Sequence, residues 1–381
     1  MRVAIGQAGG PTSVINESLA SFVSTFSDDD IYLVLNGYEG LATNQMKAMG
    51  EMQRETIERS RGEPGAVLGS GRYDFSPALQ KQALAYLMER RIEALVFIGG
   101  NGTMSALHAV QHLAEEAGYP LKVIGIPKTV DNDIAGIDHA PGFGSAAKYV
   151  AQSARYSKMD LQAMRNFEQV RILETMGRNV GWLAQASGYG MTEEAGPDAI
   201  YVPEREYSLE TILGDVRRAW KEKGYCLLVI SEGVTINNQQ TALSNSRGRT
   251  ILGGVSKVIE EAVREKLELV SRAEQLGMNQ RCYYPAVSKV DQQEAAAVGT
   301  YAAKLVQNGE SGFMVGVHRH DTMNYKAELT RVPLQIVSDG GERLLPDTYI
   351  EERKAYNEWL EGIIDLPPVS TQTQAGSSSI L

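Results

Sequence analysis

A short polar segment, residues 127–133, directly follows an apolar run and carries two carboxylates, an amide, a hydroxyl and an ammonium group. Polar groups at this density cost free energy at a strand end unless they are paired or solvated, so the pattern favours a functional loop over a plain polar turn. The chemistry it suits is phosphoryl transfer. One carboxylate would take the proton of an attacking hydroxyl, another group would help to hold Mg²⁺, and cations would neutralise the transferring group.

Three glycine-rich turns also follow predicted strands, at residues 7–13, 68–72 and 99–103. At the carboxyl edge of a parallel sheet, such turns can hold phosphate with backbone N–H groups and helix N-termini. The alternative for any single turn is that glycine only permits a tight change of direction. No Gly-Lys-Ser/Thr occurs, and residues 142–144, Gly-Phe-Gly, follow a loop instead of a strand. A P-loop and a dinucleotide fingerprint are thus absent, which disfavours a nicotinamide-dependent oxidoreductase.

An arginine follows a further strand-end turn in Glu174-Thr175-Met176-Gly177-Arg178. A guanidinium beyond a glycine turn suits a bidentate grip on phosphate. The histidines indicate no metal site, because the pairs His108/His112 and His318/His320 have no cysteine or carboxylate at zinc-ligand spacing.

The elements that must position these loops alternate between strands and helices. Apolar runs of about five residues are typical of strands buried on both faces, and helical patterns lie between them. This alternation predicts an α/β fold with parallel sheets and crossover helices. The predicted strands start at Arg2, Ile31, Ala94, Lys122, Val170 and Cys226, and the predicted helices span 14–26, 77–90, 104–117, 144–164, 209–223, 255–269 and 291–308.

A loop rich in Gly, Asp and Pro at residues 136–144 indicates a domain boundary. We therefore predict one domain over 1–138 and a second over 139–320. The segment 321–365 combines strand-like alternation with a helical pattern and is expected to pack back on the body. The Ser, Thr and Gln-rich tail, 366–381, is expected to be disordered.

The composition limits the partners. The 381 residues include 47 Asp and Glu against 37 Lys and Arg, a formal net charge of -10. That balance opposes non-specific attraction to nucleic acid or anionic lipid, so any phosphate site must be local. Two cysteines cannot form a disulfide framework, and no window reaches the ~18 apolar residues of a membrane span. We expect a cytoplasmic protein without nucleic-acid or membrane partners.

Together these motifs resemble the phosphofructokinase family, and over residues 1–335 they stand in the family's order. Residues 9–16 resemble its first phosphate loop, 37–41 and 68–72 its donor-side loops, 99–103 its magnesium and donor loop, and 128–133 its catalytic loop. Residues 176–178, 231–233 and 280–281 resemble its sugar-phosphate site. The amino-acid sequences of residues 127–131 and 141–149 are similar to those of the pyrophosphate-using branch of the family.

The resemblance implies two Rossmann-like three-layer domains with mostly parallel sheets and an active site in the cleft between them. The first domain would hold the donor-phosphate and catalytic loops, and the second would hold the sugar phosphate. The implied reaction transfers a phosphoryl group from ATP or pyrophosphate to the 1-hydroxyl of fructose 6-phosphate, giving fructose 1,6-bisphosphate in glycolysis, with Mg²⁺ as cofactor. In such enzymes an arginine usually crosses from a neighbouring subunit, so a homodimer or homotetramer is expected.

The resemblance also implies residue roles. Asp131 is the expected base, with Thr129, Asp133 and Lys128 beside it, and Arg178 offsets charge on the transferred phosphoryl. The expected donor-binding residues are Gly10, Tyr38, Arg72, Gly100, Asn101, Gly102, Thr103 and Lys128. The expected acceptor-binding residues are Thr129, Asp131, Asp133, Met176, Gly177, Arg178, Glu232, Arg272 and Arg281. The expected Mg²⁺ ligands are Asn101, Asp131 and Asp133.

Two positions bear on the donor and oppose each other. Gly102 resembles the ATP-using pattern, because it leaves room for the α-phosphate of a nucleotide, whereas pyrophosphate users usually place Asp there. Lys128 instead resembles the lysine of the pyrophosphate users. Because a steric gate acts before an added charge, the sequence favours ATP over pyrophosphate by a narrow margin.

Other positions depart from the family pattern. Asn101 stands where many members carry Asp and is a weaker Mg²⁺ ligand. Gln169 and Met278 stand where bacterial ATP enzymes place an Arg and a His for the sugar phosphate, which leaves open another acceptor such as sedoheptulose 7-phosphate. The helix over 14–26 has no Arg of the kind that binds effectors in allosteric members. A catalytically weak binding or regulatory homologue is the alternative class, and the intact Asp131 and Arg178 oppose it.

Overall fold

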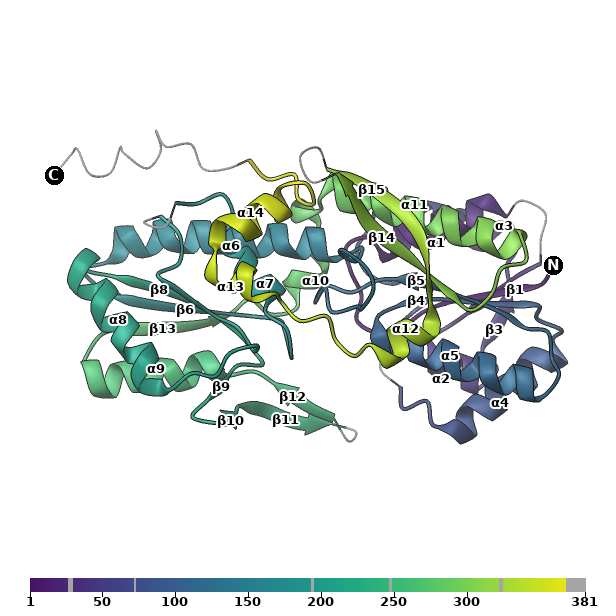
Figure 1. Ribbon diagram of the computed structural model, residues 1–381, viewed down its shortest axis with the longest axis horizontal. Coiled ribbons are helices and arrows are strands. Elements are labelled where there is room, and N and C mark those ends of the chain that lie inside the picture. Colours follow the sequence, from purple (N-terminus) through teal and green to yellow (C-terminus); the bar gives the residue numbers. More distant parts are fainter. Residues whose placement is uncertain (27–29, 72, 193–194, 247–248, 322–324, 368–381) are drawn as a thin grey trace. The chain divides into compact units, whose positions relative to one another are not determined.

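The computed structural model describes residues 1–381 except 27–29, 72, 193–194, 247–248, 322–324 and 368–381. The chain forms two compact units, and each unit combines two separate stretches of sequence (Figure 1). The first unit comprises residues 1–145 and 281–343. The second comprises residues 146–280 and the C-terminal residues from 344 onward.

The first unit is built on a seven-stranded sheet in the order β15-β14-β5-β4-β1-β2-β3. Its central strands pair in parallel, whereas β3 and β15 pair antiparallel at the two edges. The strands are β1 (Val3–Gln7), β2 (Ile31–Val34), β3 (Met46–Ala48), β4 (Ala94–Gly99), β5 (Lys122–Pro127), β14 (Phe313–Asp321) and β15 (Lys326–Pro333). The helices are α1 (Ile15–Thr25), α2 (Tyr38–Ala42), α3 (Glu51–Arg59), α4 (Pro77–Glu89), α5 (Asn101–Glu116), α11 (Lys289–Gln307), α12 (Leu334–Asp339) and a 3₁₀ turn at Tyr284–Ala286.

Alternating side chains on the central strands divide the core of this unit into two buried clusters. Leu95 and Phe97 of β4 pack with residues of α4, α5 and α12. Val96 and Ile98 of the same strand pack with residues of α1, α3 and α11. Successive strand residues point to opposite faces, so one apolar run supplies both clusters and helices cover both faces of the sheet (Figure 1).

The second unit has a parallel four-stranded sheet in the order β13-β6-β8-β7. Ile172, Leu228 and Ile230 pack with α8 and α9, whereas Arg171 points the other way and donates to Ser157 O of α6 at 3.3 Å. The strands are β6 (Val170–Thr175), β7 (Ala199–Tyr201), β8 (Cys226–Ser231) and β13 (Ser271–Gln275), with small antiparallel pairs β9 (Thr235–Ile236) with β10 (Gln239–Gln240) and β11 (Ala242–Ser246) with β12 (Arg249–Leu252). The helices are most of α6 (Phe143–Met164), α7 (Trp182–Ala186), α8 (Leu209–Lys223), α9 (Val255–Leu267), α13 (Asp347–Glu351) and α14 (Arg353–Glu361). Helix α10 (Asn279–Cys282) contains the residues at which the chain passes from the second unit to the first.

An aromatic cluster joins the C-terminal helices to the rest of the second unit. The rings of Trp182 and Trp359 lie 4.9 Å apart, and those of Trp182 and Tyr349 lie 5.9 Å apart. The Tyr356 hydroxyl donates to Trp182 O at 2.6 Å. Large buried aromatic rings contribute much apolar contact, so this cluster accounts for the packing of α13 and α14 on α7.

All six predicted strands form, as β1, β2, β4, β5, β6 and β8, and all seven predicted helices form as well. The sequence did not predict β13 or β14. The β13 residues are Ser-Arg-Ala-Glu-Gln, a charged edge strand without an apolar run. The helical pattern within the predicted segment 321–365, at residues 349–364, forms two helices, α13 and α14, instead of one.

The two units differ from the predicted domain ranges, because residues 281–343 lie with the first unit. Phe313 of β14 pairs in parallel with Ile124 of β5. Gly299 of α11 packs so closely on α1 that a Cβ there would lie 2.2 Å from Ser18 O. Pairing between residues so distant in the chain leaves no local mark in the sequence. Most of the predicted tail, 368–381, lies outside the described residues.

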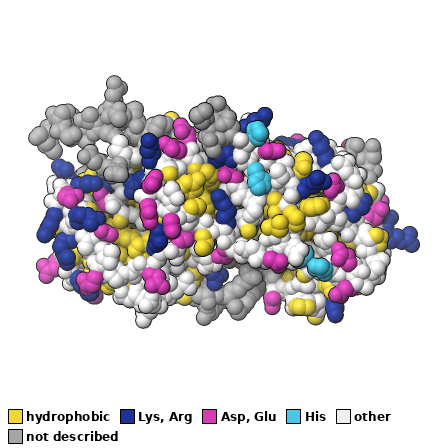
Figure 2. All heavy atoms as spheres, viewed as in Figure 1, with side chains coloured by type: hydrophobic (Ala, Val, Ile, Leu, Met, Phe, Trp, Pro, Cys, Tyr) yellow, Lys and Arg dark blue, Asp and Glu magenta, His cyan; other side chains and the backbone are white. Residues whose placement is uncertain are grey.

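No helix within the described ranges is both long and apolar enough to cross a membrane. On the face shown in Figure 2, Lys and Arg side chains are interspersed with Asp and Glu. Carboxylates therefore lie among the cations on that face, and the chain as a whole has a net charge of -10.

A buried ionic network ties α11 to the segment that follows the predicted catalytic loop. His139 is fully buried, with Nδ1 at 2.8 Å from Asp138 Oδ2 and Nε2 at 2.7 Å from Glu294 Oε2. The Tyr325 hydroxyl donates to the other oxygen of Glu294. Burial by itself would lower the pKa of His139, but Glu294 and Asp138 outweigh it and raise that pKa to about 9.

This network predicts a loss of stability in alkaline solution. A histidine whose folded pKa exceeds its unfolded pKa stabilises the fold fully below about pH 6.5, and that contribution disappears as the pH rises through about 9. The shift corresponds to at most roughly 3 kcal/mol. Urea unfolding between pH 6 and pH 10 should show a steeper alkaline decline for the wild type than for His139→Gln. His112→Gln, on the exposed face of α5, should behave as the wild type. If the free energy of unfolding fell equally with pH in the wild type and in His139→Gln, the raised pKa assigned to His139 would be wrong.

Candidate active site

The carboxyl ends of three neighbouring strands bring the predicted loops of the first unit together. β1 pairs with β4, and β4 pairs with β5. Beyond the strand ends, Ala8 N donates to Ile98 O at 2.9 Å and Lys128 N donates to Gly99 O at 2.9 Å. The first phosphate loop, the magnesium and donor loop and the catalytic loop are therefore adjacent, as the parallel topology predicted.

Lys128 links two of these loops directly. Its side chain is buried, with 4% exposed, and Nζ donates to Gly10 O at 2.7 Å. A Cβ placed on Gly9 would lie 3.1 Å from the same Nζ. The ammonium group of the catalytic loop thus sits against the backbone of the first phosphate loop, where it acts as a point charge.

The catalytic loop turns sharply between its two carboxylates. Asn132 has φ 59°, a left-handed conformation that Asn tolerates better than most residues. Its Oδ1 accepts a hydrogen bond from Ala140 N at 3.1 Å. On the near side of the turn, Asp131 N donates to Thr129 Oγ1 at 3.1 Å. These bonds hold Asp131 and Asp133 on either side of a fixed turn.

Two buried oxygen atoms beside this turn fit a magnesium ion. Among the described residues, neither Asn101 Oδ1 nor Asp133 Oδ1 has a hydrogen-bond donor, although Asn101 Nδ2 donates to Asp133 O at 2.8 Å. Burial, and next the nearby charge of Asp131, raise the pKa of the Asp133 carboxyl to about 7. A divalent cation would satisfy both oxygens and offset this cost. The described residues contain no group of three or more His, Cys, Asp or Glu that could hold a metal, so Mg²⁺ here would also need water or substrate oxygens.

The N-terminus of α5 carries the remaining donor-loop residues. Gly100 is its N-cap, and in the described part of the chain no side chain caps it and no acidic residue stands in its first turn. Its positive end is therefore available to an anion. Thr103 is buried against Gly99, and a Cβ on Gly102 would meet no atom within 4 Å. No described residue fills the position beside Gly102, and its role as a donor gate stays a prediction.

The other residues predicted for the first unit have mixed outcomes. A Cβ on Gly10 would lie 3.1 Å from Arg281 Cζ, so the guanidinium of Arg281 lies against the first phosphate loop. Ser13 Oγ donates to Arg281 O at 3.2 Å. Tyr38 is 8% exposed, and its ring stacks on Phe75 and Phe97 at 4.9 and 5.1 Å, which places it in the core beside the loops. Arg72 lies outside the described residues.

In the second unit, the turns that follow β6 and β8 interlock. Ser231 Oγ donates to Gly177 O at 2.6 Å, and Glu232 N donates to Thr175 O at 2.9 Å. Met176 N is held by Gln280 Oε1 at 2.9 Å. The structure thereby groups Met176, Gly177, Arg178 and Glu232 at one sheet edge, and Arg178 is exposed there.

Arg272 does not join this group. It pairs with Arg171 near the start of β6, four residues before Thr175, which is roughly 13 Å along the strand. Its Nε lies 3.1 Å from Glu168 Oε2. Within one chain, Arg272 therefore lies at the amino end of the sheet, away from the turn that carries Arg178.

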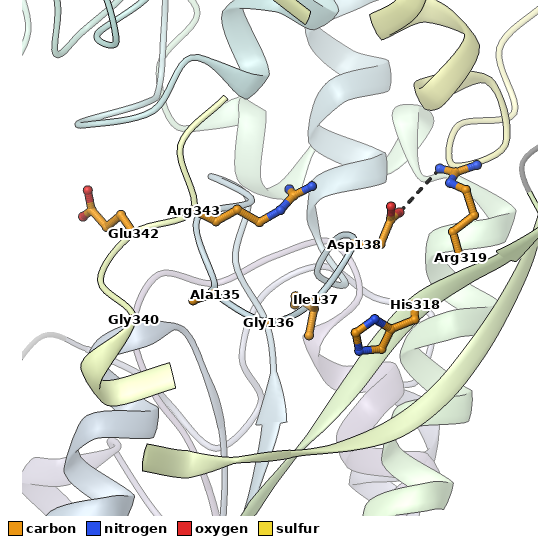
Figure 3. A pocket seen from close by; sticks show the side chains of 9 residues that line it. All are labelled: Ala135, Gly136, Ile137, Asp138, His318, Arg319, Gly340, Glu342 and Arg343. Atoms are coloured by element: carbon orange, nitrogen blue, oxygen red, sulfur yellow. Dashed lines mark hydrogen bonds and ion pairs between the residues drawn. The ribbon is translucent and has the colours of Figure 1, made fainter. Parts of the chain in front are cut away.

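A pocket of about 590 Å³ lies beside the catalytic loop (Figure 3). Arg343 N donates to Asp133 O at 2.9 Å, which joins the pocket wall to the loop. Figure 3 shows Arg319 and Arg343 reaching towards Asp138, and the Arg319–Asp138 ion pair measures 3.4 Å. None of the lining residues was predicted: Ala135, Gly136, Ile137, Asp138, His318, Arg319, Gly340, Glu342 and Arg343. The lining contains two arginines, Arg319 and Arg343, and two carboxylates, Asp138 and Glu342, so it lacks the cationic surplus expected of a phosphate site.

Two buried carboxylates, Glu174 and Asp291, bind helix N-termini, a role that the sequence did not predict. Glu174 Oε1 accepts from Gly254 N at 2.8 Å, and its Oε2 accepts from Ser256 N and Oγ at 2.9 and 2.6 Å, at the start of α9. Asp291 of α11 has the same relation to the start of α6. The spacing Ser288-x-x-Asp291 is a capping pattern that marks the start of α11, but it does not reveal the distant partner.

Comparison with known proteins agrees with this geometry. The phosphofructokinase family model matches residues 2–306, and the chain belongs to this family. It is 31% identical over 366 residues to a pyrophosphate–fructose 6-phosphate 1-phosphotransferase of Rhodospirillum rubrum, covering 92% of this chain and 89% of the relative. It is 29% identical over 332 residues to an ATP-dependent 6-phosphofructokinase of Macrococcus caseolyticus, covering 86% and 92%.

Solved structures show the same fold. The chain matches the crystal structure of a pyrophosphate-dependent phosphofructokinase from Nitrosospira multiformis with a TM-score of 0.86 and 29% identity, over 97% of this chain and 94% of that chain. A pyrophosphate-dependent phosphofructokinase from Marinobacter aquaeolei matches with a TM-score of 0.84 and 27% identity, over 97% and 94%. The predicted class of two Rossmann-like α/β domains is confirmed.

The interlocked turns of the second unit predict a steric penalty. A Cβ on Gly233 would lie 1.7 Å from Arg178 O, so Gly233→Ala should displace the turn and lower the free energy of unfolding by roughly 1–3 kcal/mol. Gly214→Ala in α8 is the matched control, because its Cβ would meet no atom within 4 Å, and alanine should stabilise that helix by ~0.5–1 kcal/mol. Urea denaturation of both variants measures the difference. If Gly233→Ala were as stable as the wild type, the turn would accommodate a Cβ without losing stability, which would contradict the prediction.

Proposed function

We propose that this protein transfers a phosphoryl group from pyrophosphate to the 1-hydroxyl of fructose 6-phosphate, giving fructose 1,6-bisphosphate. The observation that carries the choice of donor is the Lys128 ammonium, held 2.7 Å from Gly10 O between the catalytic and first phosphate loops. A compact cation at that point would neutralise the leaving phosphate of pyrophosphate.

The names of the relatives support this donor over the ATP that the sequence narrowly favoured. The relatives from Rhodospirillum rubrum, Xanthomonas campestris and Methylococcus capsulatus, at 31 to 32% identity, are all named pyrophosphate–fructose 6-phosphate 1-phosphotransferases. The sequence-based prediction of ATP gave the open space at Gly102 more weight than the charge of Lys128. Open space permits a nucleotide without attracting one, whereas a buried ammonium beside the first phosphate loop stabilises the negative charge that develops on the leaving phosphate of pyrophosphate.

ATP remains the second candidate donor, and Gly102 is the observation that favours it. A Cβ there would meet no atom within 4 Å, so the free space extends from the N-terminus of α5. The ATP-dependent relative of Macrococcus caseolyticus belongs to the same family.

The chemistry follows from the first-unit loops. Asp131 takes the proton of the attacking hydroxyl, and the turn at Asn132 holds it in place. The N-terminus of α5, which no described side chain caps, and Lys128 attract the donor phosphates. Asp133, with Asn101, would hold Mg²⁺, which shields charge on the phosphoryl oxygens when bound. Asp131 is proposed as a further ligand.

The acceptor contacts are proposed from the family resemblance. Arg281 would hold the sugar phosphate, Glu232 the sugar hydroxyls, and Arg178 the charge on the transferred group. Arg272 lies away from the Arg178 turn of its own chain, which supports its use in a neighbouring subunit of a homo-oligomer. Because Gln169 and Met278 replace the expected Arg and His, fructose 6-phosphate and sedoheptulose 7-phosphate should be compared as acceptors in a coupled assay.

Removal of the proposed base should affect turnover more than binding. Asp131→Ser should lower kcat by ~10² to 10⁴-fold while KM for both substrates changes little, because a general base acts in the transition state. Steady-state kinetics with pyrophosphate and fructose 6-phosphate measures this, and circular dichroism checks the fold. Turnover near the wild-type rate would show that another group is the base.

Donor choice is tested by removing the Lys128 charge and by filling the space at Gly102. Lys128→Met should lower kcat/KM for pyrophosphate about 10 to 10²-fold, because a charge-assisted contact contributes ~1.5–3 kcal/mol. Gly102→Asp should suppress ATP use and spare pyrophosphate, since its carboxylate would face the α-phosphate of a nucleotide.

Lys148→Met is the matched control for the lysine. Lys148 is also buried, and its Nζ lies 2.7 Å from Asp365 Oδ1 in the second unit. Its removal should leave the ratio of the two donors unchanged. Higher kcat/KM of the wild type with ATP than with pyrophosphate would overturn the proposed donor in favour of the second candidate.

A further inference from the structure

Helix α11 directs two buried carboxylates at the chain that follows the catalytic loop. Asp291 is 1% exposed and Glu294 is 6% exposed, and residues three apart lie on the same face of a helix. Glu294 holds His139, and Asp291 holds the start of α6. Both therefore act on the connection between the catalytic loop and α6. The proposed reaction assigns neither of them a role.

The Asp291 carboxylate uses both of its oxygens. Oδ1 accepts from Gly142 N at 2.8 Å, and Oδ2 accepts from Ser145 N at 2.9 Å and from Ser145 Oγ at 2.6 Å. Ser288 N in turn donates to Ser145 Oγ at 3.1 Å. A buried carboxylate with three donors at a helix N-terminus is strongly held, because the charge-assisted bonds and the helix dipole act together.

Gly142 connects the Asp291 carboxylate to the catalytic loop. Thr129 pairs with Gly142 in a parallel bridge, and Thr129 N donates to Pro141 O at 3.2 Å. A Cβ on Gly142 would lie 2.8 Å from Thr12 Cγ2 and 3.2 Å from Thr129 O. Gly142 is thus packed between the first phosphate loop and the catalytic loop, at φ 105°, where glycine is favoured.

The last link runs within the catalytic loop itself. Thr129 Oγ1 accepts from Asp131 N, so a shift of Thr129 moves the backbone of the proposed base. The path from Asp291 to Asp131 passes through Gly142 and Thr129. Its first and last steps are hydrogen bonds from a backbone N–H to a side-chain oxygen, and its middle step is a bridge between two backbone segments.

We infer that Asp291 is a positioning residue, which holds Thr129 and Asp131 in their reactive places through Gly142 without touching substrate. The inference rests on the proposed function, in which Asp131 is the base. A displacement of about 1 Å in a reacting group can cost ~10²-fold in rate, so fixing the loop contributes to kcat.

Asp291→Asn tests this inference, because the amide nitrogen cannot accept and would face an N–H group of Gly142 or Ser145. Two measurements are made: hydrogen exchange in the ligand-free protein over residues 128–133, and steady-state kinetics with pyrophosphate. Exchange at Thr129 and Asp131 should rise about tenfold or more. The kcat should fall ~10 to 10²-fold, while KM for pyrophosphate stays within about threefold.

Asp198→Asn is the matched control. Asp198 is a buried carboxylate of the second unit that accepts from Leu227 N at 2.8 Å, Lys158 Nζ at 3.0 Å and Lys223 Nζ at 2.8 Å. Its loss should lower the melting temperature without changing exchange over 128–133 or kcat. Ser145→Ala removes only the hydroxyl donor and is the second variant if Asp291→Asn does not fold. It should raise exchange over 128–133 to a smaller extent.

If Asp291→Asn folds and both exchange over 128–133 and kcat are unchanged, Asp291 is only a helix cap and the inference is overturned. If Asp291→Asn does not fold, unchanged exchange in Ser145→Ala overturns the inference in the same way. Equal changes in Asp198→Asn would overturn it too, since the effect would then follow general destabilisation. Exchange reports on the loop without turnover. If exchange rises as expected but the wild type uses neither pyrophosphate nor ATP, the positioning role of Asp291 holds and the proposed function fails.

Discussion

The hydrogen bonds between the Asp291 carboxylate and the start of α6 join three stretches of sequence that are far apart. Asp291 comes from the stretch that returns to the first unit, and Gly142 and Ser145 follow the catalytic loop. Gly142 in turn contacts the first phosphate loop at Thr12. The order of the loops at the carboxyl edge therefore depends on a buried charge that needs all three of its donors, because an unpaired carboxylate in that position would cost several kcal/mol.

The structure uses helix N-termini in two ways. At α6 and α9, buried carboxylates occupy the N-terminal N–H groups, so these ends bind protein instead of ligand. At α5, the described side chains provide no such cap, and the end remains available to an anion. With Lys128 beside it, this arrangement gives a local positive site in a chain whose net charge is -10. Phosphate recognition thus depends on placement and not on overall charge.

The grouping of the loops was predictable, because each loop carries a short motif at the end of a predicted parallel strand. The loops after β1, β4 and β5 lie together because the carboxyl ends of parallel strands share one edge, and the turns after β6 and β8 do so for the same reason. Tyr38 stacks on Phe97 in the core, a packing role that its motif did not predict, and its donor-binding role stays a prediction. Asp291 was missed for a different reason, because its local sequence is that of an ordinary capping residue of its own helix.

The sequence by itself determined the α/β class, the six strands with apolar runs and the loop that carries Lys128 and Asp131, because strand burial and local polar density are properties of neighbouring residues. Tertiary structure decided that β14 pairs with β5 and that α11 packs on α1, which places residues 281–343 in the first unit. It also decided that Asp291 binds Gly142 and that Lys128 reaches Gly10. These contacts depend on which distant surfaces bury each other, and no short segment of the sequence contains that information.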